Sequence, residues 1–262
     1  HLLFADYADW FETTAQDLFC RFPARRSLLA PTPARRARVA RWGLRFADSL
    51  ARGRIKSLQG KYIQHIESGY ESTRASLVNL DSDAFRERVR APGLVVFQGP
   101  LVRDNTSFRK HADTVRHYFR PRADDAERVA QLISRIRDRV DVLIGVHIRH
   151  GDYGQFMHGR YFFTIEQYAA AVERVRALWG TKRTGVLICS NAQQPVDRFR
   201  QPAFASNGSV IQDVYALAAC DYIVGPPSTF SQWASFYGRV PRYGFTDIHA
   251  RPTLDDFRVV EV

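Results

Sequence analysis

The chain has 262 residues, which suits one large domain or two small ones and is long enough to bury a core. Hydrophobic residues make up 45% of it, which excludes extensive disorder, and its three widely spaced cysteines exclude a disulfide framework and a zinc ribbon. The net charge is +11, and no apolar run approaches the ~20 residues that a membrane span needs. These figures indicate an ordered globular protein with a surplus of arginine.

Much of that surplus lies between Arg25 and Lys61, where eleven basic residues face a single acidic one, Asp48. Within this basic region, residues 34–52 are expected to be helical, because apolar residues recur every three or four positions. The region is either a solvated helix face or a surface that attracts an anionic membrane or acidic glycans. Nucleic acid is not an expected partner, because no zinc finger, RNP-like aromatic motif or recognition helix accompanies the charge.

A buried strand and two helices are predicted next in the chain. Residues 93–99 (GLVVFQG) place four apolar residues between glycines, and residues 108–119 read as a helix that Pro121 ends. A second helix opens at Asp124 and Asp125 and shows an apolar face. We place the domain boundary here, with an N-terminal domain at residues 1–121 and a C-terminal domain at residues 122–262.

From Asp141 onward, strands and helices alternate regularly. We expect strands at residues 142–148, 185–190, 222–224 and 240–245, and helices at residues 164–178, 211–219 and 229–237. Thr164 and Gln167 form a capping-box pattern at the start of the first of these helices. Strands separated by helices form parallel sheets, so the pattern predicts an α/β fold with a doubly wound sheet.

Two strand ends carry several polar side chains each. The first is residues 147–153 (HIRHGDY), at the end of the strand predicted at residues 142–148. Parallel sheets bind ligands beyond the carboxyl ends of their strands. Arg149 there has the geometry to bind phosphate oxygens with two parallel hydrogen bonds. Two other interpretations stay open: Arg149 pairs with Asp152 to hold the turn, or His147, His150 and Asp152 bind a metal, for which the spacing matches no standard motif.

The second strand end with several polar side chains is residues 225–231 (GPPSTFS), where a strand passes into a helix. Free N–H groups and hydroxyls at a helix N-terminus form an anion site. Thr229 and Gln232 fit a second capping box, so a plain strand-to-helix turn is the alternative. A fixed cation on one loop and a helix terminus on the other are together what a nucleotide diphosphate requires.

These residues resemble the GDP-fucose-dependent fucosyltransferases, most closely the bacterial α-1,2-fucosyltransferase group. The signature H-x-R-R-G-D-Y of that family stands here as HIRHGDY at residues 147–153, and its C-D-Y-x-x-G-P-P-S-T-F-S-W-W-A segment as CDYIVGPPSTFSQWA at residues 220–234. The segment LICSNA at residues 187–192 also resembles the family. The resemblance covers roughly residues 140–245, and its two motifs are specific.

The resemblance implies a GT-B-type fold of two Rossmann-like lobes, with an acceptor-side N-terminal lobe that lacks its first strand here. It implies inverting transfer of L-fucose from GDP-β-L-fucose to a hydroxyl of a glycan acceptor, with no metal and no cofactor besides this donor. Arg149 carries over as the diphosphate ligand, and His147 and Asp152 as catalytic candidates near it. The expected donor-binding residues are Arg149, His150, Asn191, Asp221, Ser228, Thr229, Phe230 and Ser231.

Three departures from the family pattern stand out. His150 replaces the second arginine of the first motif, Gln232 replaces a tryptophan of the second, and the glycine-rich opening of the family is absent. The chain begins in mid-pattern at His1, so we expect that opening upstream of it. The changes at His150 and Gln232 favour, to a small degree, a non-catalytic binder of acidic glycan or membrane surface, and a transferase for another nucleotide sugar is a further alternative.

In the expected mechanism, Arg149 and the N–H groups of residues 228–230 stabilise the charge that grows on the leaving GDP. The acceptor hydroxyl needs a base, for which Asp152 is the candidate unless it orients Arg149 instead. The N-terminal acids Asp6, Asp9 and Glu12 are the other candidates. The acceptor-side candidates are His158, Arg160 and Tyr161, which otherwise form a polar loop. In a bacterial cell we expect a cytoplasmic protein, since no disulfide pattern is present, with its basic region against the inner face of the membrane.

Overall fold

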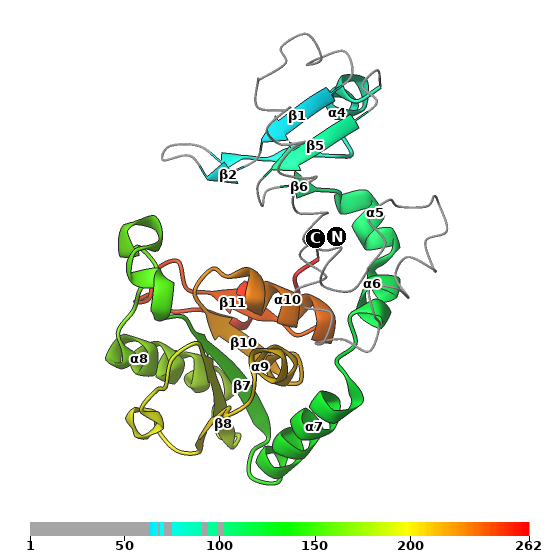
Figure 1. Cartoon of the computed structure of the whole chain (residues 1–262). Helices are drawn as coiled ribbons and strands as arrows, with labels where there is room; N and C mark the ends of the chain where they lie inside the picture. The colour runs from blue at the N-terminus through cyan, green and yellow to red at the C-terminus, as the bar shows by residue number, and fades with distance from the viewer. Residues whose placement is uncertain (1–62, 68, 71–74, 91–93, 99–101, 262) are drawn as a thin grey trace, which may run out of the picture. The chain divides into compact units, whose positions relative to one another are not determined.

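The computed structural model describes residues 63–67, 69–70, 75–90, 94–98 and 102–261. The chain divides into two compact units between Arg120 and Pro121 (Figure 1). The basic region from Arg25 to Lys61, its predicted helix and the three N-terminal acids lie outside the described residues.

The first unit contains a parallel pair of strands, β1 (Ile63–Glu67) and β5 (Leu94–Gln98), and the second of these confirms the strand predicted at residues 93–99. The prediction of a single helix at residues 108–119 is wrong, because two short helices cover this segment. His111 has a non-helical φ of −109° and separates two short helices. The remaining elements of this unit are β2 (Gly69–Tyr70), β3 (Ala75–Ser76), β4 (Val78–Asn79), α4 (Asp83–Arg88), β6 (Val102–Arg103), α5 (Asn105–Lys110) and α6 (Ala112–Tyr118).

The second unit is built on a five-stranded sheet in the order β11-β10-β7-β8-β9, in which every pairing is parallel. This confirms the predicted α/β fold with a doubly wound parallel sheet. Its strands are β7 (Val142–Ile148), β8 (Thr184–Ser190), β9 (Ala203–Ala205), β10 (Tyr222–Gly225) and β11 (Arg242–Gly244). Its α-helices are α7 (Ala123–Arg137), α8 (Ile165–Arg176), α9 (Val210–Leu217) and α10 (Thr229–Gly238).

Short 3-10 turns complete the second unit at Gly151–Gly154, Phe156–Gly159, Ala177–Trp179, Val196–Arg198 and Leu254–Asp256. The predicted capping box at the start of α8 is present: Thr164 Oγ1 accepts from the N–H of Gln167 at 3.3 Å, and the Gln167 side chain accepts from the N–H of Thr164 at 2.8 Å. Sequence reasoning missed β9, because three residues are too few to show a period.

The central strand β7 is buried over its whole length, as its continuous apolar run predicts. Val142, Ile144, Val146 and Ile148 pack on the α8 side of the sheet, while the alternate residues face α9 and α10. Figure 1 shows α8 and α9 on opposite sides of the strands. At Gly145 an added Cβ would lie 2.7 Å from Leu217 Cδ2, so α9 packs directly on the strand. His147 follows on this same face and therefore points toward α10.

Candidate functional site

The candidate site lies where the connections from two neighbouring strands diverge. In the register of the sheet, Val224 of β10 lies beside Val146 of β7, so both strands end at the same edge. From β7 the chain proceeds to β8 on one side, and from β10 it proceeds to β11 on the other. Such a switch point opens the crevice in which doubly wound sheets bind ligands.

Arg149, directly after β7, is held by the carboxylate of Asp152. Its Nε donates to Oδ1 at 2.8 Å and its Nη2 to Oδ2 at 3.1 Å. The hydrogen bonds raise the pKa of Arg149 and lower the pKa of Asp152 below its ordinary value. The pairing uses one edge of the guanidinium and leaves the N–H groups of Nη1 for a ligand. The predicted salt bridge is thus present, and it is compatible with anion binding by the same side chain.

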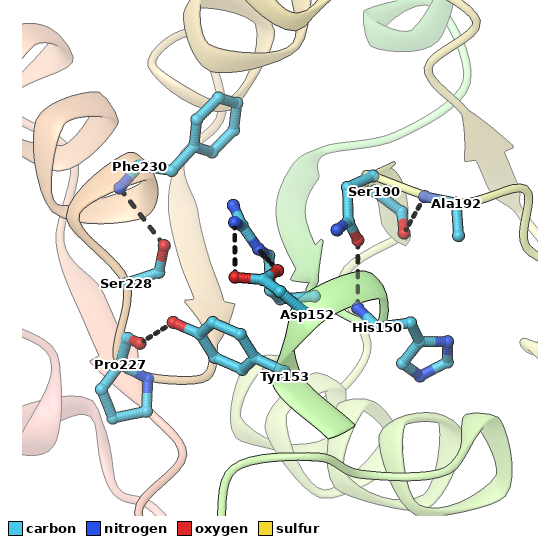
Figure 2. A network of polar contacts seen from close by, with 10 residues as sticks. His150, Asp152, Tyr153, Ser190, Ala192, Pro227, Ser228 and Phe230 are labelled. Atoms are coloured by element: carbon cyan, nitrogen blue, oxygen red, sulfur yellow. Dashed lines mark hydrogen bonds and ion pairs between the residues drawn. The ribbon is translucent and has the colours of Figure 1, made fainter. Parts of the chain in front are cut away.

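Tyr153 ties this loop to the loop after β10. Its hydroxyl donates to the carbonyl of Pro227 at 2.6 Å, and Figure 2 shows the side chain reaching from one strand end to the other. The guanidinium of Arg149 lies 5.4 Å from the centre of the Tyr153 ring. The first motif and the second motif are therefore joined at one place on the sheet edge.

The second loop ends in the N-terminal turn of α10. Ser228 is the cap residue: its hydroxyl accepts from the N–H of Phe230 at 3.3 Å, as drawn in Figure 2. The capping box predicted from Thr229 and Gln232 is wrong, because the helix begins one residue earlier than that pattern requires. Helix geometry leaves the other N–H groups of this first turn without intrahelical acceptors, so they are available to an anion.

His147 is a buried neutral imidazole between the two loops. The residue is only 3% exposed, and its ring lies 5.0 Å, centre to centre, from the ring of Phe230. Burial, helped by the charges of Arg242 and Arg149, lowers its pKa from 6.5 to about 3. Its Nδ1 atom is buried and makes no hydrogen bond with the described residues. At neutral pH this side chain is therefore a neutral imidazole with one N–H group, and not the imidazolium that could act as a general acid.

His150 does not supply the donor contact expected of it. Its Nε2 lies 2.9 Å from the carbonyl of Phe163 and its Nδ1 3.3 Å from Gln194 Nε2, so both ring nitrogens are occupied. Figure 2 shows its ring pointing away from Asp152 and Tyr153. Its backbone N–H instead donates to Asn191 Oδ1 at 3.0 Å, which places Asn191, at the end of the neighbouring strand β8, beside the motif.

The assignment of Asp221 to the donor site is wrong. Asp221 precedes β10 and accepts from the N–H of Leu143 at 2.7 Å, near the start of β7. It also receives two hydrogen bonds from the guanidinium of Arg137. Leu143 and Arg149 are six residues apart on an extended strand, which is roughly 20 Å. Asp221 therefore belongs to the opposite edge of the sheet, where it fastens α7 to two strands.

The predicted acceptor-side residues lie on the exposed loop after the first motif. Arg160 stacks over Tyr161 at 5.4 Å, and His158 has a left-handed φ of 57°. The loop reaches the site through Phe156, whose ring stacks on Tyr153 at 5.1 Å. Two further apolar side chains are exposed in the same segment, Met157 and Phe162.

Sequence reasoning missed Arg242 on β11. Its Nε donates to Ser231 Oγ at 2.9 Å and its Nη2 to the carbonyl of Pro226 at 2.7 Å, so it lies against the start of α10. The available signal was a charged residue inside VPRYGF, a segment predicted to be a strand of a covered sheet. Arg242 was not predicted because β11 lies next to β10 only through the strand order of the sheet, which neither segment shows by itself.

Three further findings concern the described residues as a whole. No group of three histidine, cysteine, aspartate or glutamate side chains in them is placed to hold a metal ion. A pocket of about 240 Å³ lies between α7 and the connection from β9 to α9, with Arg128, Arg135 and Asn207 in its wall. None of the predicted site residues lines this pocket. No helix in the described part of the chain has the length and apolar character needed to cross a bilayer.

The sequence model of glycosyl transferase family 11 matches residues 106–239, which hold both motifs. The chain belongs to this family, and the predicted membership of the fucosyltransferase superfamily is confirmed. No curated protein matches the chain.

Several solved structures resemble parts of it. The fucosyltransferase NodZ from Bradyrhizobium is 22% identical over 58% of this chain and 54% of its own, with a TM-score of 0.44. POFUT1 in complex with GDP-fucose is 13% identical over 66% and 58%, with a TM-score of 0.39. FUT1 from Arabidopsis thaliana, in complex with GDP, is 13% identical over 75% and 52%, with a TM-score of 0.45. The chain spans about half the length of the NodZ structures.

Proposed function

We propose that this chain transfers L-fucose from GDP-β-L-fucose to a hydroxyl of a glycan acceptor, with inversion and without a metal ion. In this proposal it is an α-1,2-fucosyltransferase-like enzyme of the two-lobed GT-B type, and the second unit is its donor-binding lobe. Membership of glycosyl transferase family 11 supports the reaction class. The observation that carries the donor site is the Tyr153–Pro227 hydrogen bond, which joins a guanidinium and a helix N-terminus at one strand edge.

The chemistry needs positive charge where the leaving group becomes negative. When the bond between fucose and the β-phosphate breaks, electrons pass to the GDP oxygens while the sugar ring becomes positively charged. Arg149 and the first-turn N–H groups of α10 would stabilise that growing charge without having to move. Because Asp152 holds two of the guanidinium donors, the side chain keeps one orientation before the donor binds.

Asp152 is better suited to orienting Arg149 than to acting as the base. Its lowered pKa makes it a weak proton acceptor, and both of its oxygens already receive hydrogen bonds. In this proposal Asp152 is therefore the residue that orients Arg149. His147 would line the site as a neutral group that excludes water and packs against Phe230. The general base then comes from elsewhere, with Asp6, Asp9 and Glu12 as the remaining candidates.

The acceptor would approach over the loop that follows the first motif. The exposed rings of Phe156 and Phe162 offer apolar faces of the kind that pack against sugar rings. His158, Arg160 and Tyr161 add hydrogen-bonding groups on the same segment. The left-handed backbone at Met157 and His158 is a local strain that supports a functional role for this loop.

The test is binding and turnover with the full chain in the presence of a metal chelator. Calorimetry should detect GDP binding, and a panel of GDP- and UDP-sugars should show hydrolysis or transfer with GDP-fucose above the others. Preference for a UDP-sugar would favour a different transferase. Absence of GDP binding, together with binding to acidic glycans or anionic vesicles, would favour the non-catalytic alternative.

A further inference from the structure

Arg242 is a guanidinium that is largely removed from solvent and has no acidic partner among the described residues. Burial lowers its pKa from 12.5 to about 10. Among the other arginines of the second unit that lose solvent, Arg137 pairs with Asp221 and Arg176 with Glu173, whereas Arg174 donates to two backbone carbonyls. Within the part of the chain that the structure describes, Arg242 forms no ion pair, and its hydrogen bonds go to two neutral oxygens.

The two bonds place its charge beneath the tip of α10. One acceptor is Ser231 Oγ in the first turn of the helix, and the other is the carbonyl of Pro226 in the loop that leads to it. The Nη1 atom makes no hydrogen bond with the described residues and retains its two donors. The neighbouring hydroxyl of Tyr153 is the titratable group that acts on Arg242 electrostatically.

This arrangement is unfavourable without a further anion. A buried cation loses hydration that neutral hydrogen bonds recover only in part, and the positive end of a helix dipole lies next to it. The charge of Arg242 also reaches His147, whose pKa is lowered mainly by burial and next by Arg242, ahead of Arg149. The energetic deficit would be removed by a ligand that brings negative charge between α10 and the loop after β7.

We propose that Arg242 is a second donor-binding residue, which with Arg149 forms a two-cation clamp on the diphosphate across the tip of α10. This inference rests on the proposed function, because the anion that it names is the diphosphate of the GDP-sugar. Arg149 follows β7 and Arg242 lies on β11, and these two strands flank β10. The two cations thereby approach one ligand from opposite sides, and Tyr153 lies beside both.

The test compares how Arg242→Gln affects GDP and guanosine, which differ only in the diphosphate. Glutamine keeps an amide donor for Ser231 or Pro226 but removes the charge. A charged hydrogen bond of about 1.5–3 kcal/mol corresponds to a roughly 10- to 100-fold loss of GDP affinity, which calorimetry measures. Guanosine affinity should stay at the wild-type value. Arg183→Gln, a variant of an arginine before β8, is the matched control and should change neither affinity.

The outcomes separate the inference from the function on which it rests. Equal losses for GDP and guanosine would mean that Arg242 only supports the loop, and unchanged GDP affinity would mean that it is not a ligand. Either result overturns the inference while wild-type GDP binding upholds the proposed function. A wild-type chain that does not bind GDP overturns both. If the glutamine variant does not fold, Arg242→Met, which keeps much of the side-chain length without the charge, takes its place; a selective loss for GDP supports the inference, and an equal loss for both ligands or unchanged GDP affinity overturns it.

Discussion

In the parallel sheet of the second unit, the arginines at the amino edge, where the strands begin, differ in their partners from those at the carboxyl edge, where the strands end. At the amino edge, Arg137 and Arg183 are each bound by a carboxylate, Asp221 and Asp141, that also accepts a backbone N–H. At the carboxyl edge, Arg149 is paired with Asp152 in the same way, but Arg242 has no acidic partner within the described residues and donates to two neutral oxygens. Of these four arginines, Arg242 is therefore the one whose charge is left for an anionic ligand to balance.

The largest effect is expected from removing Arg149, whose counterpart at the other edge is Arg183. Both are bound by two hydrogen bonds to an aspartate, so they test position rather than residue type. Arg149→Ala should lower the rate of fucose transfer on the order of 10²- to 10³-fold, because it removes a donor to the growing phosphate charge. Arg183→Ala should leave the rate unchanged.

Both variants should remain folded, since surface ion pairs contribute only about 0–1 kcal/mol to stability. Transfer assays and thermal unfolding of the two purified variants provide the measurement. Equal rates in the two variants would contradict the assignment of the site to one edge.

Asp221→Ala should produce the reverse pattern, a loss of stability with intact binding. It leaves the buried N–H of Leu143 and the guanidinium of Arg137 without their acceptor, which costs about 1–3 kcal/mol. Urea unfolding should show this loss, and calorimetry should show GDP affinity equal to that of the wild type. A selective loss of GDP affinity in a stable variant would return Asp221 to the donor site.

Tyr153→Phe should have a smaller effect on binding. It removes the hydroxyl that joins the two loops while keeping the ring beside Arg149. A neutral hydrogen bond of about 0.5–1.5 kcal/mol predicts a roughly two- to tenfold loss of GDP affinity. Tyr222→Phe, at the amino edge, is the control and should bind GDP normally. Identical GDP affinities of the Tyr153 variant and the wild type would show that the Tyr153–Pro227 hydrogen bond does not contribute to donor binding.

A separate effect concerns the pH dependence of stability, and it comes from two groups near the carboxyl edge. His147 has a pKa of about 3 in the folded chain, so protonation of the unfolded chain below pH 6.5 lowers stability as pH falls. Burial raises the pKa of Asp213 from 3.8 to about 6, so between those values the folded chain holds an extra proton and gains stability as pH falls.

The two slopes oppose each other between about pH 4 and 6. Asp213→Asn removes only the second, so this variant should lose stability on acidification faster than the wild type, by up to about 1.4 kcal/mol per pH unit. Urea unfolding at pH 4, 5, 6 and 7 measures both curves. Parallel curves would show that Asp213 does not titrate in this range.

The sequence predicted the strand at residues 142–148, the capping box of Thr164 and Gln167, and the two polar loops that follow β7 and β10. These features depend on hydrophobic periodicity and capping chemistry, which are local properties of the chain. The prediction for Asp221 failed because the second motif, residues 220–234, contains the whole of β10. Asp221 precedes β10 and Ser228 follows it, so residues seven apart in the chain lie at opposite edges. Sequence reasoning missed Arg242 because the neighbouring position of β10 and β11 is a property of the fold and not of either segment.

Hydrogen–deuterium exchange with and without GDP tests the difference between the two edges most directly. The account predicts that GDP slows exchange in peptides covering residues 149–154 and 226–232 at the carboxyl edge. Peptides covering residues 139–143 and 218–222 at the amino edge should exchange at the same rate in both conditions. Protection of the amino-edge peptides, or equal exchange everywhere despite saturating GDP, would contradict a donor site at the carboxyl edge.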